Sequence, residues 1–101
     1  MRHVVFLPEA ELEMIEAALY YQSQASGLGI DFLSVVEHAL KFIVESPNTC
    51  PILEGELRRR LLRRFPFGIL FRVEPGEIVV TAVAHLRRKP GYWKKRTKRQ
   101  P

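Results

Sequence analysis

The sequence is poor in cysteine, in long apolar runs and in clustered metal ligands. Cys50 is the single cysteine among 101 residues, so no internal disulfide can form and nothing indicates an oxidising compartment. No apolar run approaches the roughly 20 residues that a membrane span requires. No pair of His, Asp or Glu residues has the spacing of metal ligands. We therefore expect a cytoplasmic protein with no membrane span, no metal site and no cofactor.

The length and composition fit one small domain. With 47% hydrophobic residues, 101 residues can bury a modest core without covalent staples. We expect this domain to cover residues 1–93. Residues 94–101 are basic and end the chain, and charged chain ends are commonly mobile, so we expect a mobile tail there.

Acidic and basic residues lie in different halves of the chain. Residues 1–56 hold nine acids and two bases, a net charge of −7, whereas residues 57–101 hold fourteen bases and two acids, a net charge of +12. Folding does not need this asymmetry. A basic surface attracts nucleic acid phosphates or acidic protein segments, although a basic face can also serve solubility alone.

The N-terminal half predicts a strand followed by two helices. The run 3–7 is apolar and too short for a helix, and Pro8 begins a helix that reaches about Ala25. Its apolar positions, expected to face the core, are Leu12, Ile15 and Leu19, widened by Met14, Ala18 and Tyr21. The acidic run Glu9, Glu11, Glu13 and Glu16 is typical of a solvated face.

The second helix follows the turn 26–29 and ends near Ser46-Pro47. Its inward positions show the clearest helical period of the chain: Phe32, Val35, Val36, Ala39, Leu40 and Ile43. Because the connection is short, the two helices must form an antiparallel hairpin. The segment 48–55 is expected to be an ordered loop.

The basic half predicts three consecutive strands, over 57–65, 67–73 and 77–84. Pro75-Gly76 is a hairpin turn between the last two. Alternation places Phe67, Ile69, Phe71 and Val73 against the helices, and the last strand is apolar on both faces, which indicates a central position. The sequence thus predicts a β-α-α-β-β-β, α+β fold, with the helical hairpin on one face of a twisted, mainly antiparallel sheet.

Most basic residues remain outside the predicted core. Strand alternation would send Arg58, Arg60 and Arg64 to one face and Arg59 and Arg63 to the other. The candidates for binding nucleic acid or a protein target are Arg58, Arg60, Arg64, Arg72, Arg88, Lys89 and Trp93. Aromatic residues beside arginines grip unpaired bases, but Tyr92 and Trp93 serve equally well to pin the end of the chain onto the edge of the sheet.

Several short segments, taken in order, resemble the RelE/ParE toxin superfamily. They are Pro8-Glu9-Ala10, Gly27-Leu28-Gly29, Ser46-Pro47, Arg64-Phe65-Pro66-Phe67 and the run from His85 to Trp93. The resemblance spans nearly the whole chain and implies the toxin of a type II toxin–antitoxin pair, as in plasmid stabilisation systems. It also implies a cognate antitoxin whose extended C-terminal segment wraps the toxin and covers its functional surface.

Two molecular activities occur in that superfamily. RelE-like members are metal-independent ribonucleases that cut mRNA in the ribosome, which needs a proton acceptor, a proton donor and cations. In this chain His85, Arg87 and Tyr92 would be the catalytic residues, with Arg64 and Arg72 as further cations. A histidine at a strand end, however, more often hydrogen-bonds a neighbouring loop.

ParE-like members are not enzymes; they bind DNA gyrase and hold it on cleaved DNA. RelE-like nucleases carry an arginine where this chain has Gly68, and the chain lacks the terminal His-Tyr pair of YoeB-like relatives. These departures favour gyrase poisoning, with mRNA cleavage as the alternative. A third hypothesis is a basic module that binds nucleic acid or the ribosome without toxicity.

Overall fold

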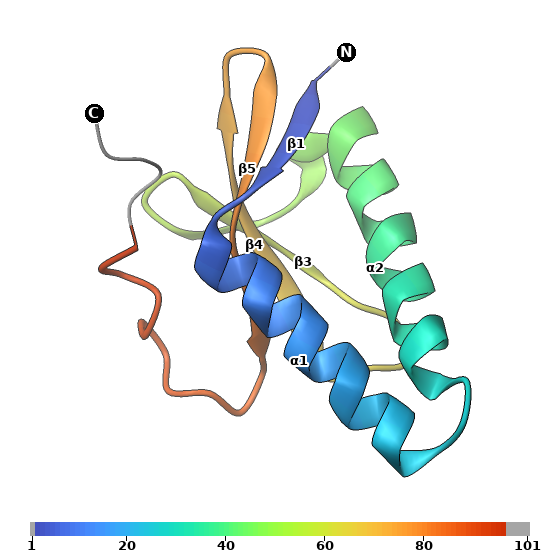
Figure 1. The fold of residues 1–101 in the computed structure, drawn as a ribbon. Helices are drawn as coiled ribbons and strands as arrows, with labels where there is room; N and C mark the ends of the chain where they lie inside the picture. The colour runs from blue at the N-terminus through green and yellow to red at the C-terminus, as the bar shows by residue number, and fades with distance from the viewer. Residues whose placement is uncertain (1, 97–101) are drawn as a thin grey trace.

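A computed structural model describes residues 2–96 of the chain. Its elements are β1 (His3–Phe6), α1 (Pro8–Gln24), α2 (Leu28–Glu45), a 3-10 turn (Pro47–Thr49), β2 (Ile52–Glu54), β3 (Leu57–Leu61), β4 (Phe67–Glu74) and β5 (Glu77–His85). The five strands form one sheet in the order β1-β5-β4-β3-β2, in which only β1 and β5 pair in parallel. Both helices lie on one face of it (Figure 1). The predicted α+β fold is confirmed, with one added edge strand.

That added strand, β2, corrects the expected loop over 48–55. Ile52–Glu54 pairs antiparallel with β3, and the register shifts between Ile52 and Glu54. Before it, the thiol of Cys50 is free and its side chain is 2% exposed. Burial raises the pKa of this thiol, although the positive charges of Arg60 and Arg58 act in the opposite direction. Cys50 is therefore a small apolar core residue.

The strand expected over 57–65 is shorter than predicted. β3 ends at Leu61, and the backbone at Arg64 has φ +70°, a left-handed conformation that a non-glycine residue rarely adopts. The chain then closes a tight turn in which the amide of Phe67 donates to the Phe65 carbonyl at 2.8 Å. The alternation of side chains between the two sheet faces therefore ends at Leu61. It does not predict the directions of Arg63 and Arg64.

Helix α1 presents to the core only part of the face that the sequence indicated: Met14, Ala18 and Tyr21 lie inward as predicted, whereas the other three predicted residues do not. Its buried residues are Ala10, Ala17 and Ala18, with Met14 and Tyr21 packed against the core beside them. The stripe Leu12, Ile15 and Leu19 is instead 55%, 45% and 65% exposed. The prediction assumed that the largest apolar side chains face the core. Instead the small alanines face the sheet and allow the helix to approach it closely, and the leucines project outward.

The C-terminal hairpin of strands is the centre of the domain. β5 lies between β1 and β4, and its residues Ile78 to Ala84 are buried, as their apolar pattern predicted. The two-residue turn Pro75-Gly76 is also confirmed, with φ +75° at the glycine. Thr81 is an extra residue in β5, because Leu70 pairs with Ala82 while the next residue, Phe71, pairs with Val80.

The two faces of the sheet are covered by different parts of the chain. The face under the helices holds the main core, which includes the α2 residues Phe32, Val36, Ala39 and Ile43 as predicted. The opposite face has a smaller cluster of Leu57, Leu70, Ala82 and Ala84, covered by Leu53, Tyr92 and Trp93. Among residues 2–96 no helix is long and apolar enough to cross a membrane.

Candidate functional site

The segment that follows β5 packs on the sheet face opposite the helices. Tyr92 and Trp93 cover its small apolar cluster, and their rings meet edge to face with centroids 5.4 Å apart. This is the pinning role considered for them in the sequence, on a face rather than an edge. A cleft of about 320 Å³ opens beside Trp93, and Arg72, Thr81 and Lys94 also line it.

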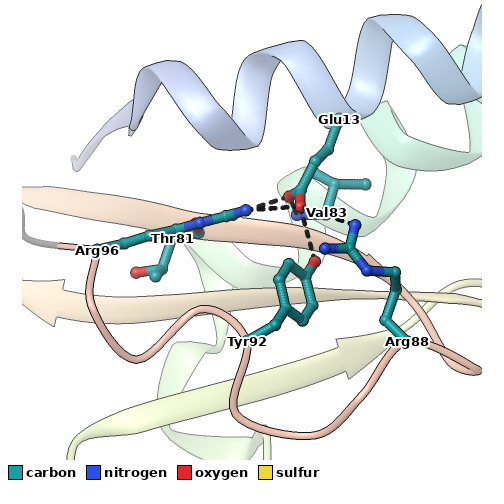
Figure 2. Close-up of polar contacts among 6 residues, drawn as sticks. All are labelled: Glu13, Thr81, Val83, Arg88, Tyr92 and Arg96. Carbon is teal, nitrogen blue, oxygen red and sulfur yellow. Dashed lines mark hydrogen bonds and ion pairs between the residues drawn. The ribbon is translucent and has the colours of Figure 1, made fainter.

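Glu13, expected on a solvated face, is the centre of a buried polar cluster. Its side chain is 13% exposed and binds the Arg96 guanidinium through two nitrogens, at 3.0 Å and 2.8 Å. The Tyr92 hydroxyl donates to the same carboxylate at 2.7 Å. Arg88 lies 3.9 Å from the carboxylate and 3.8 Å from the centre of the Tyr92 ring. Figure 2 shows these side chains converging from α1 and from the C-terminal segment.

The ion pair between Glu13 and Arg96 also hydrogen-bonds to the backbone of β5. β1 pairs with β5 only as far as Val80, because the chain then leaves the sheet to begin α1. Beyond that point the Val83 amide donates to Glu13 at 2.9 Å, and the Thr81 carbonyl accepts from Arg96 at 3.0 Å. The carboxylate and the guanidinium thus replace the backbone of a missing strand, which satisfies two groups that burial would otherwise leave costly.

These contacts set the ionisation of the cluster. Burial by itself raises the pKa of Glu13, but hydrogen bonds from Arg96, Tyr92 and the Val83 amide outweigh it, so its pKa lies below the ordinary value. The pKa of Tyr92 is strongly raised, first by burial and then by the bond to the Glu13 carboxylate. A phenol in this state is a poor proton donor to a substrate.

Arg96 packs against the folded domain. The sequence placed this residue in the tail expected over 94–101, yet its side chain is 14% exposed and is held by Glu13. Lys94, also from that range, pairs with Glu54 at 3.3 Å through side chains that are more than half exposed. The rest of the expected tail, 97–101, lies outside the described residues. The packed part of the chain therefore extends past the boundary set at residue 93.

The other candidate catalytic residues lie at the end of β5. His85 packs edge to face on Phe67 at 5.0 Å, and its Nδ1 accepts a hydrogen bond from the Arg87 amide at 3.0 Å. The side chains of Arg87 and Lys89 are exposed. Within residues 2–96 no hydrogen bond or ring contact joins His85 to Tyr92. His85 and Tyr92 therefore hydrogen-bond to different partners, the Arg87 amide and the Glu13 carboxylate.

Gly68 occupies the place where RelE-like nucleases would have an arginine. A Cβ atom at Gly68 would lie 3.1 Å from the Cγ and Cδ atoms of Arg59, so the glycine makes room for that side chain on the neighbouring strand. Arg58 is also engaged within the fold, since it donates to the Cys50 carbonyl at 2.7 Å. Arg72 lies 3.9 Å from Glu74.

A second concave site lies on the other side of the molecule, between α2 and β3. We call it the α2–β3 groove; its volume is about 470 Å³, and it is lined by Ser34, Val35, His38, Ala39, Phe42, Arg60, Leu61, Arg63 and Arg64. Two of the nine, Arg60 and Arg64, are among the binding residues predicted from the sequence. None of the nine carries a carboxylate.

The three arginines of the groove come together because β3 ends early. The Arg60 guanidinium stacks on the Phe42 ring, 3.7 Å from its centre. After Leu61 the turn brings Arg63 and Arg64 to the same groove, whereas alternation along a longer strand would have divided them. The predicted division was wrong, because it required a strand that continued to residue 65.

Few acids neutralise this groove. Arg64 lies 3.6 Å from Asp31, but both side chains are more than half exposed, so the pair is weak. Within residues 2–96 no carboxylate lies within ion-pair distance of Arg60 or Arg63. On α2, the Nδ1 atom of the exposed His38 donates to the Ser34 carbonyl at 2.9 Å. The groove is thus apolar at its floor and positive at its rim.

Comparison with known structures supports the fold. A chain from the structure "Chromosomal ParDE TA system from P. aeruginosa" superposes with a TM-score of 0.72 and 18% sequence identity, over 86% of this chain and 98% of that one. At this identity the likeness shows a shared fold. No family model matches the sequence, and no curated protein does.

Proposed function

We propose that this chain is the toxin of a type II toxin–antitoxin pair and that it arrests growth by ParE-like poisoning of DNA gyrase. The toxin part of the proposal is supported by the resemblance of the sequence to the RelE/ParE superfamily together with the fold shared with a ParDE chain. A cognate antitoxin is the partner that this proposal implies. Gyrase is the proposed target.

The observation that carries the choice of gyrase is the engagement of the candidate nuclease groups. The Tyr92 hydroxyl donates to Glu13, and its raised pKa makes it a weak acid. The Nδ1 atom of His85 accepts from a backbone amide. A ribonuclease needs a donor and an acceptor that meet at one phosphate, and these two groups have other partners. A protein that acts by binding alone has no such requirement.

One observation favours the alternative, a RelE-like ribonuclease. Arg72 and Trp93 line the same cleft on the sheet face opposite the helices, together with the acids Glu54 and Glu56. A cation beside an indole is a common means of holding an unpaired base and its phosphate. The alternative therefore places the RNA in this cleft, and not in the α2–β3 groove.

The deciding experiment presents both targets to the purified chain. One reaction holds gyrase and plasmid DNA, and the other holds a translating ribosome extract, each with wild type, His85→Ala and Tyr92→Phe. We expect gyrase-linked DNA cleavage, intact mRNA, and similar activity of all three proteins. Cutting of mRNA that both substitutions abolish would establish the ribonuclease instead. Inactivity in both reactions would leave the non-toxic basic module.

A further inference from the structure

Helix α1 is apolar on two faces, and only one of them is covered by the rest of the domain. Its alanines face the sheet, whereas Leu12, Ile15 and Leu19 on the other side are 55%, 45% and 65% exposed. At about 100° per residue, these three side chains fall within about 60° of one another, along about 10 Å of helix. Single exposed apolar residues are ordinary, but a stripe of them on one helix is typical of a surface that another protein covers.

Carboxylates flank this stripe on both sides. Glu11 and Glu16 are exposed, and around the helix they lie about 40° beyond Ile15 and Leu12 respectively. Within residues 2–96 no cation lies within ion-pair distance of either carboxylate. We call this surface the α1 ridge; it consists of Glu11, Leu12, Ile15, Glu16 and Leu19.

We propose that the chain associates with a second copy of itself by placing the α1 ridge of one copy in the α2–β3 groove of the other. The apolar side chains of the ridge would cover the floor of the groove, where Leu61 is 51% exposed. The carboxylates of the ridge would pair with Arg60 and Arg63 at the rim. The inference concerns the chain by itself and does not depend on gyrase or the ribosome as its target.

Charge complementarity selects this pairing of surfaces. The ridge carries Glu11 and Glu16 without a basic partner, and the groove carries Arg60 and Arg63 without an acidic partner, among residues 2–96. Contact between two ridges would bring carboxylates together, and contact between two grooves would bring guanidinium groups together, so both are repulsive. Of the three pairings, only the ridge in the groove joins opposite charges.

The two surfaces also match in shape and length. The groove is concave and runs along α2 from Ser34 to Phe42, about 12 Å, close to the length of the stripe on α1. A helix that lies in an apolar groove is anchored by side chains three and four positions apart, which is the spacing of Leu12, Ile15 and Leu19. A nucleic acid would use the arginines but would leave the apolar floor without partners.

The ridge and the groove are different surfaces, so the contact between two copies is heterologous. After one contact has formed, the pair still has one free groove and one free ridge. It therefore either closes by a second, reciprocal contact or adds further copies. In both cases a copy with only one intact surface can take part in one contact and no more.

The test measures association of the purified full chain, alone in solution, by sedimentation velocity from about 1 to 200 µM. Circular dichroism checks that each variant is folded. We expect wild type to associate more as its concentration rises. Leu12→Gln should raise the Kd of association by about tenfold, whereas Leu86→Gln should change it by less than about twofold, although these leucines are 55% and 49% exposed.

Matched pairs of charge substitutions separate the groove from general attraction. Arg60→Gln combined with Arg63→Gln is compared with Arg87→Gln combined with Lys89→Gln, which removes two exposed cations elsewhere. We expect the groove variant to raise the Kd by about tenfold and its control by less than about twofold.

The ridge is tested in the same way. Glu11→Gln combined with Glu16→Gln is compared with Glu37→Gln combined with Glu56→Gln, which removes two exposed acids elsewhere. The expected changes in Kd are again about tenfold and less than about twofold.

A mixture of the two weakened proteins is the decisive sample. The ridge variant keeps an intact groove and the groove variant keeps an intact ridge, so together they can form one wild-type contact. We expect the equimolar mixture to form a one-to-one complex about tenfold more tightly than either variant associates alone.

Four outcomes would overturn the proposal. Wild type that stays monomeric at every concentration would mean that other partners cover the two surfaces. A mixture that associates no better than its components would mean that the ridge does not enter the groove. Weakening by the ridge variant alone would indicate contact between two ridges, and equal weakening by the controls would indicate general electrostatic attraction.

Discussion

The two clusters of arginines in this protein differ in what neutralises them. At the C-terminal segment, Arg96 is buried and bound by both oxygens of Glu13, which also satisfies the Val83 amide. In the α2–β3 groove, Arg60 and Arg63 lie within ion-pair distance of no carboxylate in residues 2–96. The same residue type is thus held by a buried acid in one place and has no acidic partner among residues 2–96 in the other.

This difference separates stability from binding. An arginine that is desolvated and paired stabilises the fold only while its partner is present, because the alternative is a buried unpaired charge. A solvent-exposed arginine without an acidic partner contributes little to folding stability, and its charge is not neutralised within the protein. Substitutions in the two clusters should therefore affect different measurements.

The largest effect is expected at Glu13. Glu13→Ala leaves the Arg96 guanidinium buried without its acid and removes the acceptor of the Val83 amide, so the free energy of unfolding should fall by about 3 kcal/mol. Urea unfolding followed by circular dichroism measures it. Glu16→Ala, an exposed acid on the same helix, is the control and should change little. Equal losses for both variants would mean that the buried cluster contributes no more than a surface charge.

A pH titration sharpens the comparison. Because the pKa of Glu13 is lowered in the folded state, its contribution to stability is full above the ordinary value of 4.5 and is lost as the pH falls through the folded pKa. The difference in unfolding free energy between wild type and Glu13→Gln should therefore shrink below about pH 4.5. A constant difference between pH 3 and pH 7 would contradict the lowered pKa.

The local parts of this fold could be read from the sequence. The helix beginning at Pro8, the turn at Pro75-Gly76 and the apolar period of α2 each depend on residues close together in the chain. The face that α1 buries could not be read in this way. Leu12 and Ile15 are larger than Ala10 and Ala17, yet the alanines lie inward because they allow close approach to the sheet.

The candidate sites are formed by contacts between residues that are far apart in the sequence, so no short sequence pattern predicts them. Glu13 and Arg96 are 83 positions apart, and their pairing arises where β1 leaves the edge of β5. Similarly, the groove gains Arg63 because β3 ends at Leu61 and the backbone at Arg64 is left-handed. From the sequence we predicted binding residues in the basic half, since its charge exceeds what folding needs. The sequence did not distinguish the arginines that the fold uses from those that remain.

The smallest effect on stability is expected in the groove. Arg63→Gln removes an exposed cation without an acidic partner, so the free energy of unfolding should change by no more than about 0.5 kcal/mol. Arg60→Gln should cost about 0.5 to 1 kcal/mol, because it also removes the guanidinium that stacks on Phe42. Urea unfolding at neutral pH measures both, beside Glu13→Ala. If Arg63→Gln destabilised the protein as much as Glu13→Ala does, Arg63 would be a structural residue, and the contrast between the two clusters would fail.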